Sequence, residues 1–350
     1  MAGFNHFFYV CLLFTGLLSH TNVNADTECQ AVTAAGDRRT DKTKLRIVQY
    51  NVEWLFVDYY AAADCPGNGC SWVNESEAEM HINTVSKVIQ YLNPDIINFC
   101  EIEGCDELNI LKSHLNDDTY NYYLKKGTDT ATGQNVGMLT RIDPLVNLYR
   151  SETKYEYPLS GNTCGKTDVS GMSGVSKHYI TEFQFANYNV AFIAAHLLAI
   201  PTEPARCVQR EAQASVLQSV IYSYIHDKKY EVIMLGDFND YDAEIMDINS
   251  DKPTSRVLDI LKGKQGAYGG QYELHSVAET IQQPDRYSEW YDFDNNCNTK
   301  SQKDFSMIDH ILVTSNIKSS IVNAFIYHGY EEFCGTYNSD HFPVVIDLLL

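Results

Sequence analysis

The sequence predicts a layered α/β or α+β domain, and three observations support that prediction. Short apolar strands recur along the 350 residues, with helical stretches between them. Several of these strands are continuous apolar runs, which is typical of sheets that are covered on both faces. Hydrophobic residues make up 44% of the chain and charged residues 21%, which are ordinary values for a globular protein.

The predicted elements follow one another along the chain, and each rests on a local pattern. The first is a strand at residues 45–50. The second is a helix at residues 77–92, whose apolar residues lie on one face and which Pro94 ends. Further strands are predicted at residues 95–100, 136–140, 179–185, 190–195, 232–235, 307–313 and 344–349, with a long helix at 204–225. Two loop-rich stretches, 61–76 and 263–304, are predicted insertions on this scaffold.

Residues 1–25 are predicted to be a signal peptide. They contain no Asp, Glu, Lys or Arg, residues 7–18 are almost wholly apolar, and Val23-Asn24-Ala25 has the small-residue pattern of a cleavage site. No later stretch is apolar enough for a transmembrane helix. We therefore expect a protein that is secreted, extracellular or in the lumen of the secretory or endolysosomal pathway, with no stable membrane anchor. An N-terminal extension at residues 26–44 would precede a single domain at 45–350.

The cysteines fit an exported protein. The chain has ten, and Cys11 lies in the predicted signal peptide, so an odd number remains and at least one is unpaired or bonds another chain. An oxidising compartment favours disulfides over zinc sites. Candidate pairs are Cys65–Cys70, Cys100–Cys105, Cys164–Cys207 and Cys297–Cys334, although connectivity does not follow from sequence. Asn74-Glu75-Ser76 is a sequon that would permit glycosylation.

The formal net charge of -20 limits the partners that the protein can attract. A chain this acidic does not bind polyanions through its general electrostatic field. If the substrate carries phosphates, metal ions and a few local cations must bind it. The charge thus argues against a tight nucleic-acid binder, but not against an enzyme that must release its product.

Polar residues stand at the edges of the predicted strands in six places. In chain order these are Asn51-Val52-Glu53, Glu101, His196, Asp237-Phe238-Asn239, Asp309 and Asp340-His341. A single Asn or Asp after a strand is more often a turn former, and a single His there is more often structural. Because ligand sites of α/β sheets lie beyond the carboxyl ends of strands, six such segments in one chain indicate one polar centre.

This residue set predicts a particular chemistry. Carboxylates and Asn supply the hard oxygen ligands that suit Mg²⁺ or Ca²⁺, and His beside them can move protons or contact a phosphoryl group. The chain has neither a Gly-x-Ser-x-Gly elbow nor a phosphate-binding loop that ends in Gly-Lys-Ser/Thr. Hydrolysis of a phosphate ester needs a metal to neutralise charge, an activated water and a proton for the leaving group.

Two segments, residues 236–239 (Gly-Asp-Phe-Asn) and 339–343 (Ser-Asp-His-Phe-Pro), resemble motifs of the endonuclease/exonuclease/phosphatase superfamily. The likeness, strongest to its pancreatic-type deoxyribonucleases, keeps the motif order over residues 45–349. It implies a four-layer sandwich of two mixed β-sheets packed face to face and flanked by helices. It also implies a phosphodiesterase that uses Mg²⁺, with Ca²⁺ or Mn²⁺ as alternatives.

The first expectation for the activity is a DNA endonuclease that acts as a monomer on nucleic acid. A sphingomyelinase or other phospholipid phosphodiesterase is the main alternative, and a phosphatase of the same superfamily is the next. A non-catalytic binding protein is disfavoured because every key position of the motifs is filled.

The resemblance also implies a role for each matching residue. Metal binding falls to Glu101, with Asn51, Glu53 and Asp340 in support, and phosphate contact falls to Asn51, Asn239 and Lys177. Catalysis falls to His196, Asp237, Asp309 and His341. Asp237 would activate or orient the attacking water. His341 would hydrogen-bond the scissile phosphate or act as acid or base, and Asp309 would orient it.

Two positions depart from the deoxyribonuclease pattern. That branch pairs its second catalytic histidine with a glutamate, but residues 122–127 (Tyr-Tyr-Leu-Lys-Lys-Gly) contain no carboxylate. His196 is therefore expected to serve mainly as a donor to the phosphate. Lys177 stands where the family often has Arg, and a solvated surface lysine is the alternative interpretation of it.

Overall fold

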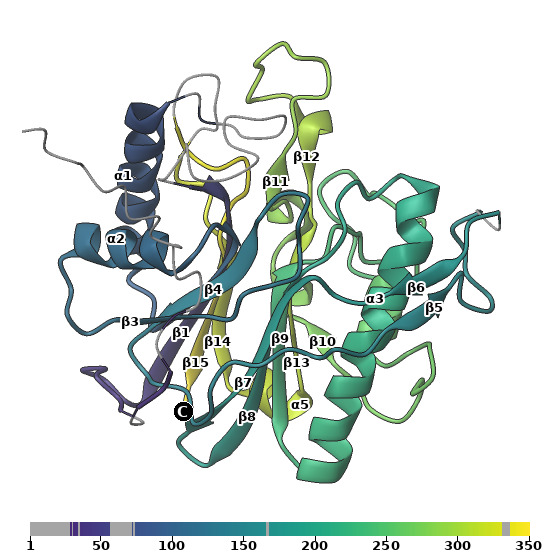
Figure 1. Ribbon diagram of the computed structural model, residues 1–350, viewed down its shortest axis with the longest axis horizontal. Coiled ribbons are helices and arrows are strands. Elements are labelled where there is room, and N and C mark those ends of the chain that lie inside the picture. Colours follow the sequence, from purple (N-terminus) through teal and green to yellow (C-terminus); the bar gives the residue numbers. More distant parts are fainter. Residues whose placement is uncertain are drawn as a thin grey trace, which may run out of the picture.

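A computed structural model describes residues 29, 31–33, 36–56, 72, 74–165, 168–330 and 337–350. Two large sheets organise this part of the chain (Figure 1). The strands of the first sheet, in spatial order, are β14 (Ile321–Ile326), β15 (Val344–Leu349), β1 (Lys44–Leu55), β2 (Ile96–Ile102), β4 (Asn135–Thr140) and β3 (Asn121–Leu124). Those of the second are β10 (His275–Ser276), β13 (Asp309–Val313), β9 (Glu231–Asp237), β8 (Tyr188–His196) and β7 (Lys177–Phe185).

Both sheets are mixed, as predicted. In the first, β1 pairs parallel with β2 and antiparallel with β15. In the second, β9 pairs parallel with β8 and antiparallel with β13. Two small ribbons, β5 (Tyr155–Tyr157) with β6 (Gly171–Ser173) and β11 (Glu289–Trp290) with β12 (Phe305–Ser306), are attached to this framework.

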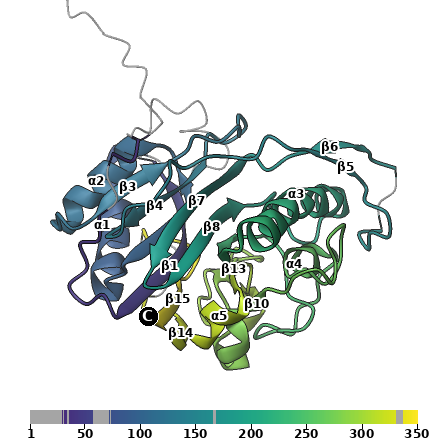
Figure 2. The ribbon, with the colours of Figure 1, turned by 90° about the horizontal axis from the view of Figure 1, so that it is seen from below.

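Helices cover the outer faces of both sheets, which gives four layers (Figures 1 and 2). They are α1 (Glu75–Leu92), α2 (Cys105–Leu115), α3 (Pro204–Ser223) and α4 (Val257–Leu261), whereas the short α5 (Ser315–Ser319) packs through Ile317 against the central core. Helices α1 and α2 pack on the first sheet, and α3 and α4 on the second. The predicted four-layer sandwich is therefore confirmed.

The strands are continuous apolar runs because both of their faces are buried. Successive residues of a strand point to opposite faces. In β1, Ile47 lies in the core between the two sheets, whereas Val48 lies in the cluster shared with α1. In β9, Leu235 belongs to the central core and Met234 to the cluster under α3 and α4.

Helix α1 shows local signals at both ends. The side chain of Asn74 accepts a hydrogen bond from the backbone N–H of Glu77 at 3.1 Å, which satisfies one of the free donors of the first turn. Asn93 ends the helix in a left-handed conformation (φ 48°), directly before Pro94. The helix thus begins two residues earlier than predicted and ends where Pro94 indicated.

The disulfides correct one sequence prediction. Cys164 pairs with Cys207, as expected, and joins the segment between β5 and β6 to α3. Cys105, however, pairs with Cys29, and Cys100 is a free, buried thiol. The prediction of Cys100–Cys105 was wrong because Cys100 on β2 faces the core between the sheets, whereas Cys105 opens α2 on the outside. Cys297 is also disulfide-bonded, but Cys65, Cys70 and Cys334 lie outside the described residues.

The predicted signal peptide, residues 1–25, and most of the first predicted insertion also lie outside the described part of the chain. No helix within the described ranges is long and apolar enough to cross a membrane.

Candidate active site

The strand-edge residues meet at one edge of the two sheets. His196, Asp237 and Asp309 occupy one row across three neighbouring strands, because β8 pairs His196 with Asp237 and β13 pairs Asp309 with Asp237. On the facing sheet, Asn51 of β1 pairs with Cys100, the residue before Glu101. Residues far apart in sequence are thus brought together by strand register.

Asn51 connects the two sheets at this centre. Its side-chain Nδ2 lies 3.3 Å from Glu101 Oε1, 3.1 Å from Asp237 Oδ2 and 3.3 Å from His341 Nε2. Its Oδ1 accepts a hydrogen bond from the backbone N–H of Glu53 at 3.1 Å. The Asn51 side chain is buried, so one amide fixes the relative positions of the acids and the histidine.

Unusual backbone conformations help to place these side chains. Glu53, Glu101 and Asn239 have positive φ angles of 47°, 69° and 50°. Such conformations cost free energy in non-glycine residues and are concentrated at functional sites. Gly236 is required for a different reason: its φ is 152°, and a Cβ atom there would lie 1.8 Å from the carbonyl oxygen of Ala195. Glycine therefore lets β9 approach β8 closely just before Asp237.

The carboxylates of Glu101 and Asp340 fit a divalent cation. Asp340 Oδ1 is buried and has no hydrogen-bond partner among the described residues. Burial, together with the nearby carboxylates of Glu101 and Glu289, raises the pKa of Asp340 to about 7 in spite of the opposing effect of His341. A crowded, unsatisfied carboxylate is stabilised when a metal ion neutralises it. The donors here are all oxygens, which suits a hard ion such as Mg²⁺.

Glu53 contacts the backbone of Asp340 rather than its carboxylate. Its Oε2 accepts a hydrogen bond from the backbone N–H of Asp340 at 3.1 Å, and the side chain is buried. The contact fixes the Asp340 segment against the end of β1. Direct binding of a metal by Glu53 stays a prediction.

His341 is held by Asp309. Its Nδ1 lies 2.7 Å from Asp309 Oδ2, and Gln49 Nε2 donates to the other oxygen, Oδ1, at 3.0 Å. Burial lowers the pKa of His341, but the negative charges of Asp309 and Asp340 outweigh it, so that the pKa lies well above its usual value. The other ring nitrogen, Nε2, is directed to the centre where Asn51 lies.

His196 has a different electrostatic environment. Its Nε2 lies 3.4 Å from Asp237 Oδ2 and 4.0 Å from Glu101 Oε1. Its Nδ1 is buried and has no hydrogen-bond partner among the described residues, in keeping with the lack of a carboxylate in residues 122–127. Burial, then the charges of Lys177 and His341, lower its pKa well below the usual value. His196 is thus a neutral ring.

Asp237 lies between the two histidines. Its Oδ1 accepts the backbone N–H of Asn239 at 2.9 Å, and burial and Asp309 raise its pKa well above the usual value. The side-chain Nδ2 of Asn239 donates to the carbonyl of Leu197 at 3.3 Å, which orients the amide beside His196. Asp237 and Asn239 therefore line the same side of the site.

Lys177 lies close to this centre but has protein partners. It pairs with His196 across β7 and β8, and its Nζ donates to Gln134 at 3.1 Å and lies 3.7 Å from Asp129. Only 8% of the residue is exposed, so the solvated-surface alternative is wrong. Contact with a phosphate would require the ammonium group to exchange these partners.

An open cavity of about 570 Å³ joins these residues. Its floor carries Glu101, His196, Asp237, Asn239, Asp340 and His341. Its rim includes the exposed side chains of Ile200, Tyr291 and Phe293. The predicted residues, apart from Asn51, Glu53, Asp309 and Lys177, thus line one solvent-connected space.

Two residues of the site were not predicted. Glu289 lines the cavity, forms a β-bridge with His341 and accepts a hydrogen bond from Ser306 Oγ. It lies in the predicted insertion, and no strand-edge pattern marks it. Gln49 supports Asp309 from within β1. A polar residue in an otherwise buried strand was the available signal for Gln49.

Comparison with known proteins bears on the fold. No protein-family model and no curated protein sequence matches the chain. Among solved structures, an endonuclease/exonuclease/phosphatase family protein from Leptotrichia buccalis is similar with a TM-score of 0.52 and 14% identity, over 87% of this chain and 100% of that one. A mannosyl-6-phosphatase from Bacteroides thetaiotaomicron is similar with a TM-score of 0.51 and 18% identity, over 87% and 100%.

A humanized TDP2 from D. rerio that carries 14 mutations is similar as well, with a TM-score of 0.50 and 15% identity, over 87% of this chain and 98% of that one. At these identities the likeness concerns the fold, and it extends over most of the described chain. Together with the two mixed sheets and the outer helices, it shows that the protein has the endonuclease/exonuclease/phosphatase fold.

Proposed function

We propose that the protein is a secreted, divalent-metal-dependent phosphodiesterase that cleaves DNA as a monomer. One observation carries the hydrolytic part: a His341 side chain fixed by Asp309 faces an unsatisfied carboxylate, Asp340, in an open cavity that also holds Glu101 and Asp237. A metal site, a proton donor and a group that can orient water are the parts that hydrolysis of a phosphate ester requires. The signal-like residues 1–25 support secretion.

Glu101 and Asp340, with Asn51 beside them, would hold the metal. A bound divalent cation would neutralise negative charge on the phosphoryl group. Asp309 keeps the His341 ring in one orientation, so that its Nε2 can donate a proton or a hydrogen bond to a phosphate oxygen. Asp237, adjoining Asn239, is placed to accept a proton from a water in the cavity. The neutral ring of His196 would donate a hydrogen bond to a second phosphate oxygen.

The cavity rim supports a nucleic acid as the substrate. Tyr291 and Phe293 are 62% and 79% exposed, and both border the cavity. Exposed aromatic rings are the surfaces on which unpaired bases stack. The net charge of -20 would oppose tight retention of a polyanion and so favour release of cleaved strands.

A phospholipid phosphodiesterase is the second candidate, and the same two aromatic side chains favour it. A membrane-docking loop places aromatic residues at the lipid interface. In this loop, however, Asp292 and Asp294 alternate with Tyr291 and Phe293, and insertion of these rings into a lipid interface would bring the carboxylates into a poorly hydrated region at a high cost. We therefore favour the nucleic acid.

A substrate panel tests the proposal. Purified mature protein is incubated with plasmid DNA, RNA, sphingomyelin and inositol phosphates, each with Mg²⁺ and with EDTA. We expect nicking of the plasmid that EDTA abolishes. Nicking that persists in EDTA would contradict the metal requirement. Turnover of sphingomyelin without cleavage of any nucleic acid would overturn the choice of DNA, but it would agree with the proposed phosphodiesterase activity.

A further inference from the structure

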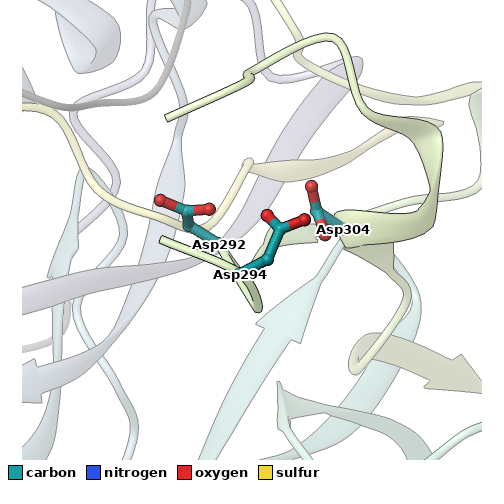
Figure 3. Close-up of side chains that lie close together, drawn as sticks. All are labelled: Asp292, Asp294 and Asp304. Carbon is teal, nitrogen blue, oxygen red and sulfur yellow. The ribbon is translucent and has the colours of Figure 1, made fainter. Parts of the chain in front are cut away.

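A second group of carboxylates lies outside the catalytic centre, on the loop that joins β11 to β12. It consists of Asp292, Asp294 and Asp304, and one oxygen of each lies within 4.8 Å of the others (Figure 3). Asp304 also contributes to the outer wall of the active cavity, but the other two do not. None of the three belongs to the strand-edge set assigned to catalysis.

Asp304 distinguishes this cluster from an ordinary acidic surface. It is only 4% exposed, and neither of its carboxylate oxygens has a hydrogen-bond partner among the described residues. A buried carboxylate without a partner costs several kcal/mol, to the order of magnitude, and such groups are normally paired or bound to a metal. Figure 3 shows its carboxylate close to that of Asp294. The acid is thus placed where a cation would satisfy it.

The other two acids keep free coordination capacity. The oxygens of Asp292 accept the backbone N–H groups of Asn296 and Cys297, both at 3.0 Å, which leaves further lone pairs on each oxygen. Asp294 contacts the ammonium group of Lys303 at 2.5 Å, but 61% of the Lys303 side chain is exposed. Lys303 can therefore rotate into solvent when a stronger cation arrives.

We propose that Asp292, Asp294 and Asp304 bind one Ca²⁺ ion, separate from the catalytic metal. The donors are all oxygens, which both Ca²⁺ and Mg²⁺ accept. Three protein carboxylates favour Ca²⁺, because Mg²⁺ usually keeps several waters and takes only one or two carboxylates. The three oxygens all lie within 4.8 Å of one another, so one ion can contact all of them. Calcium also tolerates irregular ligand sets, as a loop of this kind would supply.

The ion would link the loop to the active cavity. Asp292 and Asp294 lie in the part of the loop that follows β11, and Asp304 lies directly before β12. The carbonyl of Asp304 accepts the backbone N–H of Tyr291 at 2.7 Å, and Ser306 in β12 donates to Glu289 in the cavity. Calcium would therefore fix the rim that carries Tyr291 and Phe293, and would act on substrate binding more than on the chemical step.

Calcium binding tests the proposal without any assay of catalysis, so its outcome is independent of the proposed function. Full-length mature protein is titrated with Ca²⁺ by calorimetry and by equilibrium dialysis with radioactive calcium. We compare Asp304→Asn and the double variant Asp292→Asn/Asp294→Asn with Glu101→Gln, which removes the main predicted catalytic ligand. Asp227→Asn is the matched control, because Asp227 is exposed in the helical segment Tyr224–Lys228 that follows α3.

We expect both loop variants to lose one Ca²⁺ per chain, or to bind it about tenfold or more weakly, because carboxylate number sets calcium affinity. Glu101→Gln and Asp227→Asn should keep that ion. Lys303→Gln should bind it more tightly, since it removes the competing ammonium group. Wild-type stoichiometry and affinity in both loop variants would overturn the proposal, as would loss of all Ca²⁺ binding in Glu101→Gln.

Thermal unfolding separates an ion site from a merely structural acid. In EDTA, Asp304→Asn should unfold at or above the wild-type temperature, because the change removes a buried, unpaired charge. With millimolar Ca²⁺, the wild type should be stabilised and the variant should not. Equal destabilisation of the variant with and without Ca²⁺ would show that Asp304 has a structural role only, and would refute the site.

Discussion

At the residue scale, the geometry of the site depends on a few buried side chains that each contact two or more other site residues. Asn51 touches acids on both sheets and one histidine. Asp309 accepts from His341 with one oxygen and from Gln49 with the other. Since both acceptors of Asp309 are occupied, the His341 ring has one orientation. Each of these contacts can be removed by a single substitution.

The first prediction concerns His341. Replacing it with Ala should lower kcat by about 10²- to 10⁴-fold, because a positioned acid or base contributes roughly that much. Plasmid nicking under single-turnover conditions measures the loss, and circular dichroism confirms that the fold is kept. His226→Ala is the control, since His226 is exposed in the helical segment that follows α3. Activity near that of the wild type in the His341 variant would refute its role.

The second prediction concerns Gln49, which acts only through Asp309. Gln49→Leu removes the hydrogen bond to Asp309 and leaves Asn98, which donates to Gln49 at 2.6 Å, without its acceptor. We expect a fall in kcat of about 10-fold or more with little change in KM, as for other residues that orient a functional side chain.

Tyr179→Phe is the matched control for Gln49. Tyr179 donates to Asn98 at 2.8 Å, at the far end of the same chain of hydrogen bonds, and does not reach Asp309. Its loss should cost about 1 kcal/mol of stability and leave kcat unchanged. Equal kcat values for the two variants would mean that Gln49 supports only the core.

At the element scale, strand register converts sequence positions into a site. The sequence predicted most of the long central strands, because burial on both faces makes them continuous apolar runs. It missed β14, whose edge position leaves it half-exposed, and β5 and β6, which are three residues each and depend on pairing with one another. Helix α2 was missed although Leu108, Leu111 and Leu115 have helical spacing.

The residues of the candidate site could likewise be predicted only where a local sequence pattern marks them. Residues at the ends of long strands, such as Glu101 and Asp237, could be predicted because strand ends converge. Glu289 could not, since its place depends on a bridge to His341 that no local pattern encodes. Nor could the partner of Cys105, because pairing with Cys29 depends on how the N-terminal segment packs against α2.

The third prediction concerns β7 and pH. His178, buried on β7, donates from Nδ1 to the carbonyl of Val175 and accepts at Nε2 from the N–H of Ser151, both at 2.9 Å. Burial, with a contribution from Arg150, lowers its pKa from 6.5 to about 3. Between these values the unfolded chain binds a proton that the folded protein does not. The stabilisation is therefore fully present above pH 6.5 and is lost as the pH falls.

Urea unfolding at pH 7 and pH 5 measures this effect. His178 should account for roughly 2 kcal/mol of the stability that the wild type loses over this range, at about 1.4 kcal/mol per pH unit below 6.5. His178→Gln removes the titrating group and should show a correspondingly shallower dependence, although it is less stable at pH 7. Parallel pH dependences for the two proteins would contradict the prediction.

At the scale of the whole molecule, a strongly acidic protein surrounds the candidate site, which we propose acts on a phosphate ester. The formal net charge is -20, and residues 1–25 contribute no charged side chain to it. Glu101, Asp237, Glu289 and Asp340 place four further carboxyl groups in the cavity itself, and none of its lining residues there except His196, His341 and Lys303 offers a basic side chain. In the proposed function, a substrate phosphate would approach against the general field and would be attracted only at short range, by the metal and by hydrogen bonds from His341.

The fourth prediction follows from this field. Raising NaCl from about 10 to 150 mM shortens the screening length from about 30 to 8 Å, which weakens repulsion between the protein and DNA. We expect KM for plasmid DNA to fall while kcat stays constant, at fixed Mg²⁺. A dinucleotide with one phosphodiester should show almost no change, because it carries a single charge. A KM for DNA that rises steeply with salt would instead indicate binding by a cationic surface, as in proteins that release counterions from many phosphates.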